Sequence, residues 1–330
     1  MKLATLKNGS RDGRLVIVSR DLSHAVDASP IAATMQSALE DWSSAEPALR
    51  ELASRLEAGQ VDGSFDFEPE RAMAPLPRAY QFVDASAFLN HGDIMAQAFR
   101  LTIDRPDGVP LLVQRQADDF RGPRDEYELR SDADDCDYEG EFAVIVGEIP
   151  MGSSPGRCEH AVRLIVLLND VSMRRFVVPE LRMGFGFINA KPATVFAPVA
   201  VTVDELGAAW RDGRIHLDLR VERNGELLGH PNGGEMDWSF GELLAHLAYN
   251  RHLRAGTILG SGTISNRQAE KVGSACLAEV RALETIAHGR PISPWLRHGE
   301  RVTFEVLDEH GLSVFGAIDH RFVVSGPVEG

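Results

Sequence analysis

The chain has 330 residues, of which 44% are hydrophobic and 25% are charged, and its formal net charge is −15 at pH 7. These proportions are ordinary for a folded protein, and the negative charge argues against nonspecific binding to nucleic acid or to an anionic membrane surface. The longest apolar runs, such as residues 163–170 (RLIVLLND), are far too short to span a bilayer, and the first 14 residues hold no apolar segment typical of a signal peptide. We therefore expect a cytoplasmic protein with no nucleic-acid or membrane partner.

The first quarter of the chain predicts a small domain of its own. Residues 3–27 contain short apolar runs separated by polar turns, which predicts strands. Residues 43–60 place three leucines at helical spacing, with Ser44 as the N-cap and Pro47 in the first turn, and so predict one amphipathic helix.

Residues 65–80 contain three prolines and no clear period, which is typical of a linker. We therefore divide the chain into a small N-terminal domain, 1–75, and a main domain, 76–330.

The main domain is predicted to be mostly β, because its apolar runs are short and rich in β-branched residues. Residues 223–226 (RNGE) are a hairpin signal. Two helices are expected, one near 95–99 and one over 239–256, where Ser239 and Glu242 form a capping box and Gly256 is the C-terminal stop. The fold class is therefore α+β, mostly β, with few helices.

The three cysteines are scattered and form no CxxC pair. A disulfide framework or a structural zinc site is therefore not expected, and small buried residues are the simpler interpretation.

The most informative stretch is DYEGEFAVIVG (137–147), in which Glu139 and Glu141 open an apolar, β-prone run. Side chains two apart on a strand point to the same face, so this strand directs two like charges at one place. That arrangement costs energy unless a cation or a base lies between the two carboxylates.

Further acids end or precede apolar runs, among them Asp84 and Asp170. A single acid at a strand end is more often solvated than functional, and spacing alone does not bring these two to the glutamates. A group of carboxylates would suit a hard divalent ion such as Mg²⁺ or Ca²⁺ and would not favour zinc.

Five segments together resemble the fumarylacetoacetate hydrolase family in order, interval and flanking residues. They are DASAFLNH (84–91), DYEGEFAVIVG (137–147), LLNDVSMR (167–174), NAKPATVFAPV (189–199) and GSGTISN (260–266). The resemblance covers roughly residues 75–325. It implies a mixed β-sandwich or β-roll catalytic domain after a small N-terminal domain, and a homodimer.

The resemblance also implies a metal site. In that family four carboxylates bind one Mg²⁺ or Ca²⁺, with Mn²⁺ a further possibility, and by motif match they are Asp84, Glu139, Glu141 and Asp170.

The same resemblance assigns catalytic roles. His91, seven residues after Asp84, would be the general base that takes a proton from water, and Glu279 is the candidate for its orienting carboxylate. The alternative for Glu279 is a glutamate on a helix surface. Lys191 would stabilise negative charge that develops on the substrate.

Arg100, Arg174 and Thr263 match residues on the substrate side of the family's site, with solvated arginines as the alternative for the first two. Two positions depart from the fumarylacetoacetate pattern. Val113 or Gln114 stands where a tyrosine is expected, and Val177 stands where a glutamine is expected, which puts the exact substrate in doubt.

These matches predict a metal-dependent hydrolase that cleaves a C–C bond in a 1,3-diketone such as fumarylacetoacetate or an acylpyruvate, in aromatic catabolism of the tyrosine type. The alternatives are a 2-keto acid decarboxylase, hydratase or isomerase of the same family, or a member that binds a metal or ligand without catalysis. His91 favours hydrolysis, because cleavage by water needs a base dedicated to water.

Overall fold

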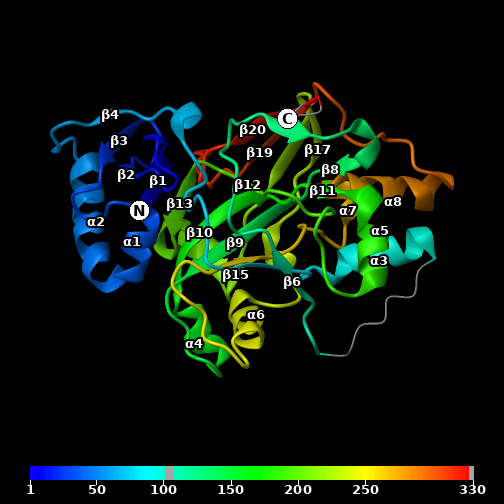
Figure 1. Ribbon diagram of the computed structural model, residues 1–330, viewed down its shortest axis with the longest axis horizontal. Coiled ribbons are helices and arrows are strands. Elements are labelled where there is room, and N and C mark those ends of the chain that lie inside the picture. Colours follow the sequence, from blue (N-terminus) through cyan, green and yellow to red (C-terminus); the bar gives the residue numbers. More distant parts are fainter. Residues whose placement is uncertain (101–107, 327–330) are drawn as a thin grey trace.

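The computed structural model describes residues 1–100 and 108–326, and its framework is one eleven-stranded sheet (Figure 1). β9 lies between β10 and β18 in this sheet, and β18 pairs in parallel with β5. In spatial order the strands are β4 (Phe65–Asp66), β3 (His24–Asp27), β2 (Arg14–Val18), β1 (Lys2–Leu6), β13 (Val199–Thr202), β10 (Val162–Asn169), β9 (Gly140–Val146), β18 (Ile258–Gly260), β5 (Phe82–Ala85) and β6 (Leu112–Arg115), and β12 (Val195–Phe196) also pairs with β10.

The strands of the first 75 residues continue the sheet of the main part of the chain. β1 pairs antiparallel with β13, with Leu3 opposite Ala200. The strands predicted over 3–27 are confirmed as β1, β2 and β3. The predicted division at residue 75 stays a prediction, because hydrogen bonds of one sheet cross it.

A second sheet packs against the first through a common apolar core. Tyr138 meets Phe304, and Phe142 meets Phe315, with ring centroids 5.7 and 6.0 Å apart. Its strands are β17 (Glu226–Gly229), β16 (Arg220–Arg223), β19 (Arg301–Glu305), β20 (Ile318–Val324) and β7 (Tyr127–Leu129); two small ladders join β8 (Cys136–Asp137) to β11 (Ser172–Met173) and β14 (Trp210–Arg211) to β15 (Arg214–Ile215). The hairpin predicted at 223–226 is confirmed between β16 and β17.

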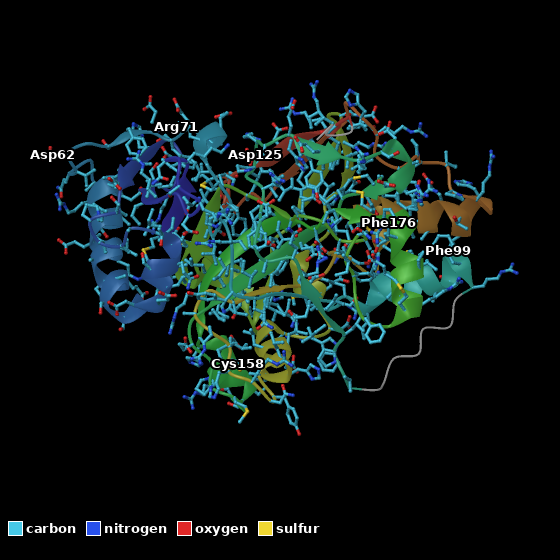
Figure 2. The ribbon with its side chains drawn as sticks, in the orientation of Figure 1. Asp62, Arg71, Phe99, Asp125, Cys158 and Phe176 are labelled. Atoms are coloured by element: carbon cyan, nitrogen blue, oxygen red, sulfur yellow. The ribbon has the colours of Figure 1, made fainter. Side chains whose placement is uncertain are left out.

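The helices lie at the ends and edges of this framework. α1 and α2 pack at the end formed by the N-terminal strands, whereas α3, α5 and α8 gather at the opposite end, where Figure 2 labels Phe99 and Phe176. None of the helices in the described part of the chain is both long and apolar enough to cross a membrane. The helices are α1 (Met35–Glu40), α2 (Trp42–Glu57), α3 (Leu89–Phe99), α4 (Pro155–Glu159), α5 (Arg174–Met183), α6 (Phe240–Leu247), α7 (Ala269–Val272) and α8 (Leu277–His288), with 3₁₀ turns η1 (Pro69–Arg71), η2 (Asp132–Asp134), η3 (Val203–Ala209) and η4 (Gly233–Glu235).

The predicted fold class is confirmed, since the chain is mixed α and β with more sheet than helix in its framework. Three local predictions were wrong. α2 begins at Trp42 with Asp41 as its N-cap, so Ser44 lies inside the helix. Part of 65–80 is β4 at the sheet edge rather than a linker.

The third error concerns α6. Its capping box of Ser239 and Glu242 is confirmed, but the helix ends at Leu247, nine residues before Gly256. Residues 249–255 instead bring Leu253 into a two-way backbone pairing with Ile149. The backbone hydrogen bonds between Leu253 and Ile149 replace the helical hydrogen bonds that the local sequence would favour.

His320 of β20 connects the two sheets and generates a stability prediction. Its Nε2 accepts a hydrogen bond from Asn169 Nδ2, 3.1 Å away, and its ring is buried. Burial lowers the pKa of His320 from 6.5 to about 4. Between these two pH values the unfolded chain binds a proton that the folded chain does not, so the free energy of unfolding falls as the pH drops from 6.5 toward 4, by up to about 3 kcal/mol.

We expect the variant His320→Gln, which keeps a hydrogen-bonding side chain but does not titrate, to lose this part of the acid sensitivity. Urea unfolding of both proteins at several pH values from 4 to 7 measures it. Parallel pH profiles for the two proteins would contradict the assignment.

Candidate active site

Three acids from the central part of the large sheet lie close together. Asp84 lies on β5, Glu141 on β9, and Asp170 directly follows β10. β18 holds the first two in register, because Gly260 pairs with Asp84 on one side and with Ala143 on the other. One oxygen of each acid lies within 4.8 Å of the others, and all three side chains are buried.

The protein compensates this negative charge only in part. Burial and the neighbouring Asp170 raise the pKa of Asp84 from 3.8 to about 6, and burial together with Asp84 raises the pKa of Glu141 well above its usual range. The amide of Gly262 donates to Asp84 Oδ1 and Glu141 Oε2, at 3.1 and 3.2 Å, but Glu141 Oε1 has no partner. A buried group of carboxylate oxygens with an unpartnered member fits a hard divalent cation.

Asp170 and Glu139 are held by cations of the protein itself. Lys191 Nζ lies 2.7 Å from Asp170 Oδ2 and 3.0 Å from Glu139 Oε2, and Arg115 Nη2 donates to Asp170 Oδ1. Burial opposes ionisation of Glu139, but Lys191 and Arg174 outweigh it and lower the pKa of this carboxyl. Glu139 lines the same pocket without belonging to the three-oxygen group, so its role as a fourth metal ligand stays a prediction.

His91 and Glu279 form a dyad beside the acids. His91 on α3 places Nδ1 2.8 Å from Glu279 Oε2 on α8, and Glu279 Oε1 accepts from Ser274 Oγ at 3.0 Å. Glu279 is fully buried, whereas His91 is partly open to the pocket. A buried carboxylate at Nδ1 favours the proton on that nitrogen and leaves Nε2 free to accept a proton from water.

His91 of the dyad, Asp84 of the three-acid group and Glu139 line one cavity of about 270 Å³. Its inner end is polar and also contains Lys191, Arg115, Arg174 and Thr263. Its outer wall is apolar and consists of Met95, Leu111, Val113, Val177, Leu181 and Phe187.

The structure treats the three predicted substrate residues differently. Thr263 lies in the cavity with its buried Oγ1 unpartnered. Arg174 also lines it, but its guanidinium faces Asp137 at 2.7 Å and Glu139 at 2.5 Å. Arg100 is exposed at the C-terminal end of α3 in a left-handed conformation and does not line the cavity, so its substrate role stays a prediction.

Arg115 is a site residue that the sequence interpretation missed. It is buried on β6, and its Nε and Nη1 have no hydrogen-bond partner among the residues that the structure describes. The sequence did contain one sign of this role. Arg115 is the single basic residue in the apolar run of 110–115, and it lies two positions from Val113 and so on the same face of the strand.

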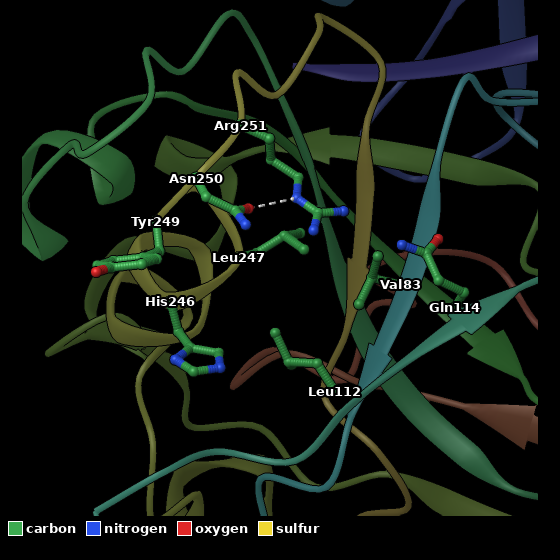
Figure 3. A pocket seen from close by; sticks show the side chains of 8 residues that line it. All are labelled: Val83, Leu112, Gln114, His246, Leu247, Tyr249, Asn250 and Arg251. Atoms are coloured by element: carbon green, nitrogen blue, oxygen red, sulfur yellow. Dashed lines mark hydrogen bonds between the residues drawn. The ribbon is translucent and has the colours of Figure 1, made fainter. Parts of the chain in front are cut away.

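A second hollow, of about 320 Å³, lies on the other face of β5 and β6 (Figure 3). It is lined by Val83, Leu112 and Gln114, which alternate with Asp84, Val113 and Arg115, and by the end of α6. Arg251 contacts the neighbouring Asn250 there at 3.2 Å. No acid is among its lining residues, so it offers no cation site comparable to the first.

The acid group predicts an effect of divalent cations on stability. A raised carboxyl pKa means that the ionised acid costs the metal-free folded state free energy as the pH rises through about 6. At pH 7 we expect metal-free Asp84→Asn to be about 1 to 3 kcal/mol more stable than the parent. Adding Mg²⁺ or Mn²⁺ should raise the melting temperature of the parent by several degrees and that of the variant far less.

Thermal unfolding after chelation, with and without added cation, measures both effects. Glu148→Gln, at an exposed acid paired with Arg254, is the matched control and should respond to the cation like the parent. Equal cation responses of Asp84→Asn and the parent would contradict the site.

Gly260 predicts a second effect. A Cβ atom at Gly260 would collide with Asp84 Oδ1 and lie 3.0 Å from Glu141 Oε2, so an alanine there must displace the carboxylates. We expect Gly260→Ala to weaken Mg²⁺ or Mn²⁺ binding at least about tenfold, measured by calorimetry. Gly156→Ala, where a Cβ meets nothing within 4 Å, should bind like the parent; equal weakening in both variants would refute the argument.

Known proteins share this fold. A structure of maleylpyruvate hydrolase from Sphingobium sp. SYK-6 in complex with manganese(II) and pyruvate aligns with a TM-score of 0.66 and 15% identity, over 99% of this chain and 100% of that one. A structure of 5-carboxymethyl-2-hydroxymuconate delta-isomerase from Mycobacterium smegmatis aligns with a TM-score of 0.61 and 16% identity, over 99% and 100%. Identities this low support the fold alone.

The sequence relatives also show low identity, and they align over only part of their length. Fumarylacetoacetase of Arabidopsis thaliana is 26% identical over 298 residues, 78% of this chain and 65% of that protein. Fumarylacetoacetase of Caenorhabditis elegans is 25% identical over 207 residues, 54% of this chain and 50% of that protein. The chain thus aligns with half to about two thirds of the length of these relatives.

Two family models account for almost the whole chain. The fumarylacetoacetase N-terminal domain 2 matches residues 1–78, and the fumarylacetoacetate (FAA) hydrolase C-terminal model matches residues 82–323, which contain every acid of the cluster, the His91–Glu279 dyad and Lys191. Since the second match alone covers more than half of the chain, the protein belongs to the fumarylacetoacetate hydrolase family.

Proposed function

We propose that the protein is a divalent-cation-dependent hydrolase that cleaves a C–C bond in a 1,3-diketo acid of the fumarylacetoacetate or acylpyruvate type. The observation that carries this proposal is the His91–Glu279 dyad beside a cavity lined by both His91 and Asp84, the latter one of three buried carboxylates that lie together. A base for water and a cation site in one cavity are the two components that hydrolytic C–C cleavage requires.

Asp84, Glu141 and Asp170 are the residues that would hold the cation. When bound, it supplies Lewis acidity toward the diketone oxygens and compensates the buried acids. Carboxylate oxygens accept Mg²⁺, Ca²⁺ and Mn²⁺ alike, and a manganese(II) complex of a structural neighbour supports the last as an alternative to the first two.

His91 acts as the base in this proposal. Its Nε2 takes a proton from water, the water oxygen bonds to the carbonyl carbon, and Glu279 stabilises the imidazolium through Nδ1–H. The bond from that carbon to the carbon between the two carbonyls then breaks, so that a carboxylic acid forms and the electron pair stays on the other fragment as an enolate. The imidazolium returns its proton to the enolate carbon.

Lys191 is suited to stabilise the enolate oxygen. Its ammonium group has three N–H donors, and Asp170 and Glu139 take two of them. The two acids also raise the pKa of Lys191 although its burial opposes this, so the group stays cationic at neutral pH. Its remaining donor can stabilise developing negative charge.

Relatives with an isomerase name share the fold, so the fold itself does not select hydrolysis. The buried carboxylate at His91 Nδ1 favours hydrolysis over isomerisation, hydration or decarboxylation, because it prepares the imidazole to accept a proton from water.

We expect His91→Asn to lower kcat for an acylpyruvate about 10² to 10⁴-fold while Mg²⁺ binding stays unchanged. Glu279→Gln should lower kcat in the same direction by a smaller factor. Loss of the diketone absorbance measures the reaction, with and without a chelator, and the exposed His310→Asn is the control. Full hydrolysis by His91→Asn would remove the proposed base, and a reaction that the chelator does not affect would remove the cation.

A further inference from the structure

The outer wall of the active-site cavity is apolar on all the elements that form it. Met95 comes from α3, Leu111 and Val113 from β6 and the residue before it, Val177 and Leu181 from α5, and Phe187 from the loop after α5. Leu111 and Leu181 are each 60% exposed, so this wall is the mouth of the cavity. A group that extends outward from the acid cluster must therefore pass between hydrocarbon side chains.

The side of the wall formed by α5 and its loop is fixed in place. The buried carboxylate of Glu180 accepts hydrogen bonds from the amides of Ile188, Asn189 and Ala190, at 2.8, 2.8 and 3.1 Å. These three amides follow Phe187 directly and precede Lys191. The three hydrogen bonds to Glu180 thus connect the apolar wall to the polar end of the cavity and give the wall a preformed shape.

Positive charge is confined to the inner end of the cavity. Among the lining residues that the structure describes, the lysine and arginines are Lys191, Arg174 and Arg115, and each is paired with a carboxylate of the cluster or of Asp137. The polar atoms left without a partner, Arg115 Nε and Nη1 and Thr263 Oγ1, are also at that end. The cavity thus offers cationic donors to one end of a keto acid. Apart from that end and the dyad, the exposed hydroxyl of Ser86 is the only side-chain donor among its described lining residues.

We propose that the substrate carries an uncharged aliphatic or aromatic arm, and that Val177, Leu181 and Phe187 select against a second carboxylate at its far end. This inference rests on the proposed function for the identity of the keto-acid end. Of the two substrate types named there it favours an acylpyruvate over fumarylacetoacetate, which carries a second carboxylate at its far end. A carboxylate among these side chains would lose part of its hydration and gain no partner, whereas a methyl group would gain apolar contact. Because the wall is at the mouth, where some hydration remains, we expect a preference of about 10 to 100-fold rather than complete exclusion.

The test uses two six-carbon probes that differ at their far end only, 2-oxohexanoate and 2-oxoadipate. Calorimetric titration of the full chain loaded with Mg²⁺ should give 10 to 100-fold tighter binding of 2-oxohexanoate. Val177→Lys should shift the preference toward 2-oxoadipate by at least about tenfold, a gain that misfolding cannot produce.

Val178→Lys is the matched control. It places the same charge one residue away on the same helix, at a side chain that is 52% exposed and does not line the cavity, and it should keep the preference of the parent. Equal or tighter binding of 2-oxoadipate by the parent, no binding of either probe, or equal shifts in both lysine variants would overturn the inference.

A hydrolysis arm separates this inference from the proposed function. Hexanoylpyruvate and its analogue with a carboxylate at the far end are compared with the same protein. If 2-oxohexanoate is preferred in binding and neither diketo acid is cleaved, the proposed function fails and the ligand preference stands. If the analogue with two carboxylates is cleaved faster, the function stands and the inference fails.

Discussion

The sheet must hold three buried carboxylates close together, and the arrangement of the surrounding residues depends on this constraint. Burial first, and then repulsion from the neighbouring acids, raises the pKa values of Asp84 and Glu141. The sheet maintains the arrangement because β9 lies between β10 and β18, and β18 pairs with β5, so displacing one acid means breaking a ladder at the centre of the sheet. Gly260 leaves the space that the carboxylates of Asp84 and Glu141 occupy.

The surrounding cations divide the acids into two groups. Lys191, Arg115 and Arg174 compensate Asp170 and Glu139, and they leave Asp84 and Glu141 with one shared backbone amide as a partner. A divalent cation is therefore most strongly attracted to the side of the cluster that the protein has not neutralised. The same division leaves the outer part of the cavity without positive charge among its described lining residues.

Helix packing at the edge of the sheet brings the His91–Glu279 dyad together. α3 and α8 are far apart in sequence, yet their contact brings the buried Glu279 to His91. α8 is itself anchored by Asp137, which accepts hydrogen bonds from the amides of Leu277 and Ala278 at its first turn while pairing with Arg174. The three acids, the dyad and the apolar wall thus depend on one connected set of contacts.

The sequence by itself determined the family, the mostly β character of the main domain and the positions of the acids, because these follow from the two-residue period of strands and from motifs that occur in fixed order. Apart from the pairing of His91 with Glu279, which the family resemblance implied, it did not determine which residues contact each other. The end of α6 at Leu247 depends on the pairing of Leu253 with Ile149. The beginning of α2 was misplaced because Asp41 and Ser44, three residues apart, are both of a type that caps helices. Arg115, the pairing of Arg174 with Asp137 and the apolar mouth were decided by the tertiary structure alone. The physical reason is that the charge state and the partners of a buried side chain are set by neighbours that are distant in sequence, and no local pattern records them.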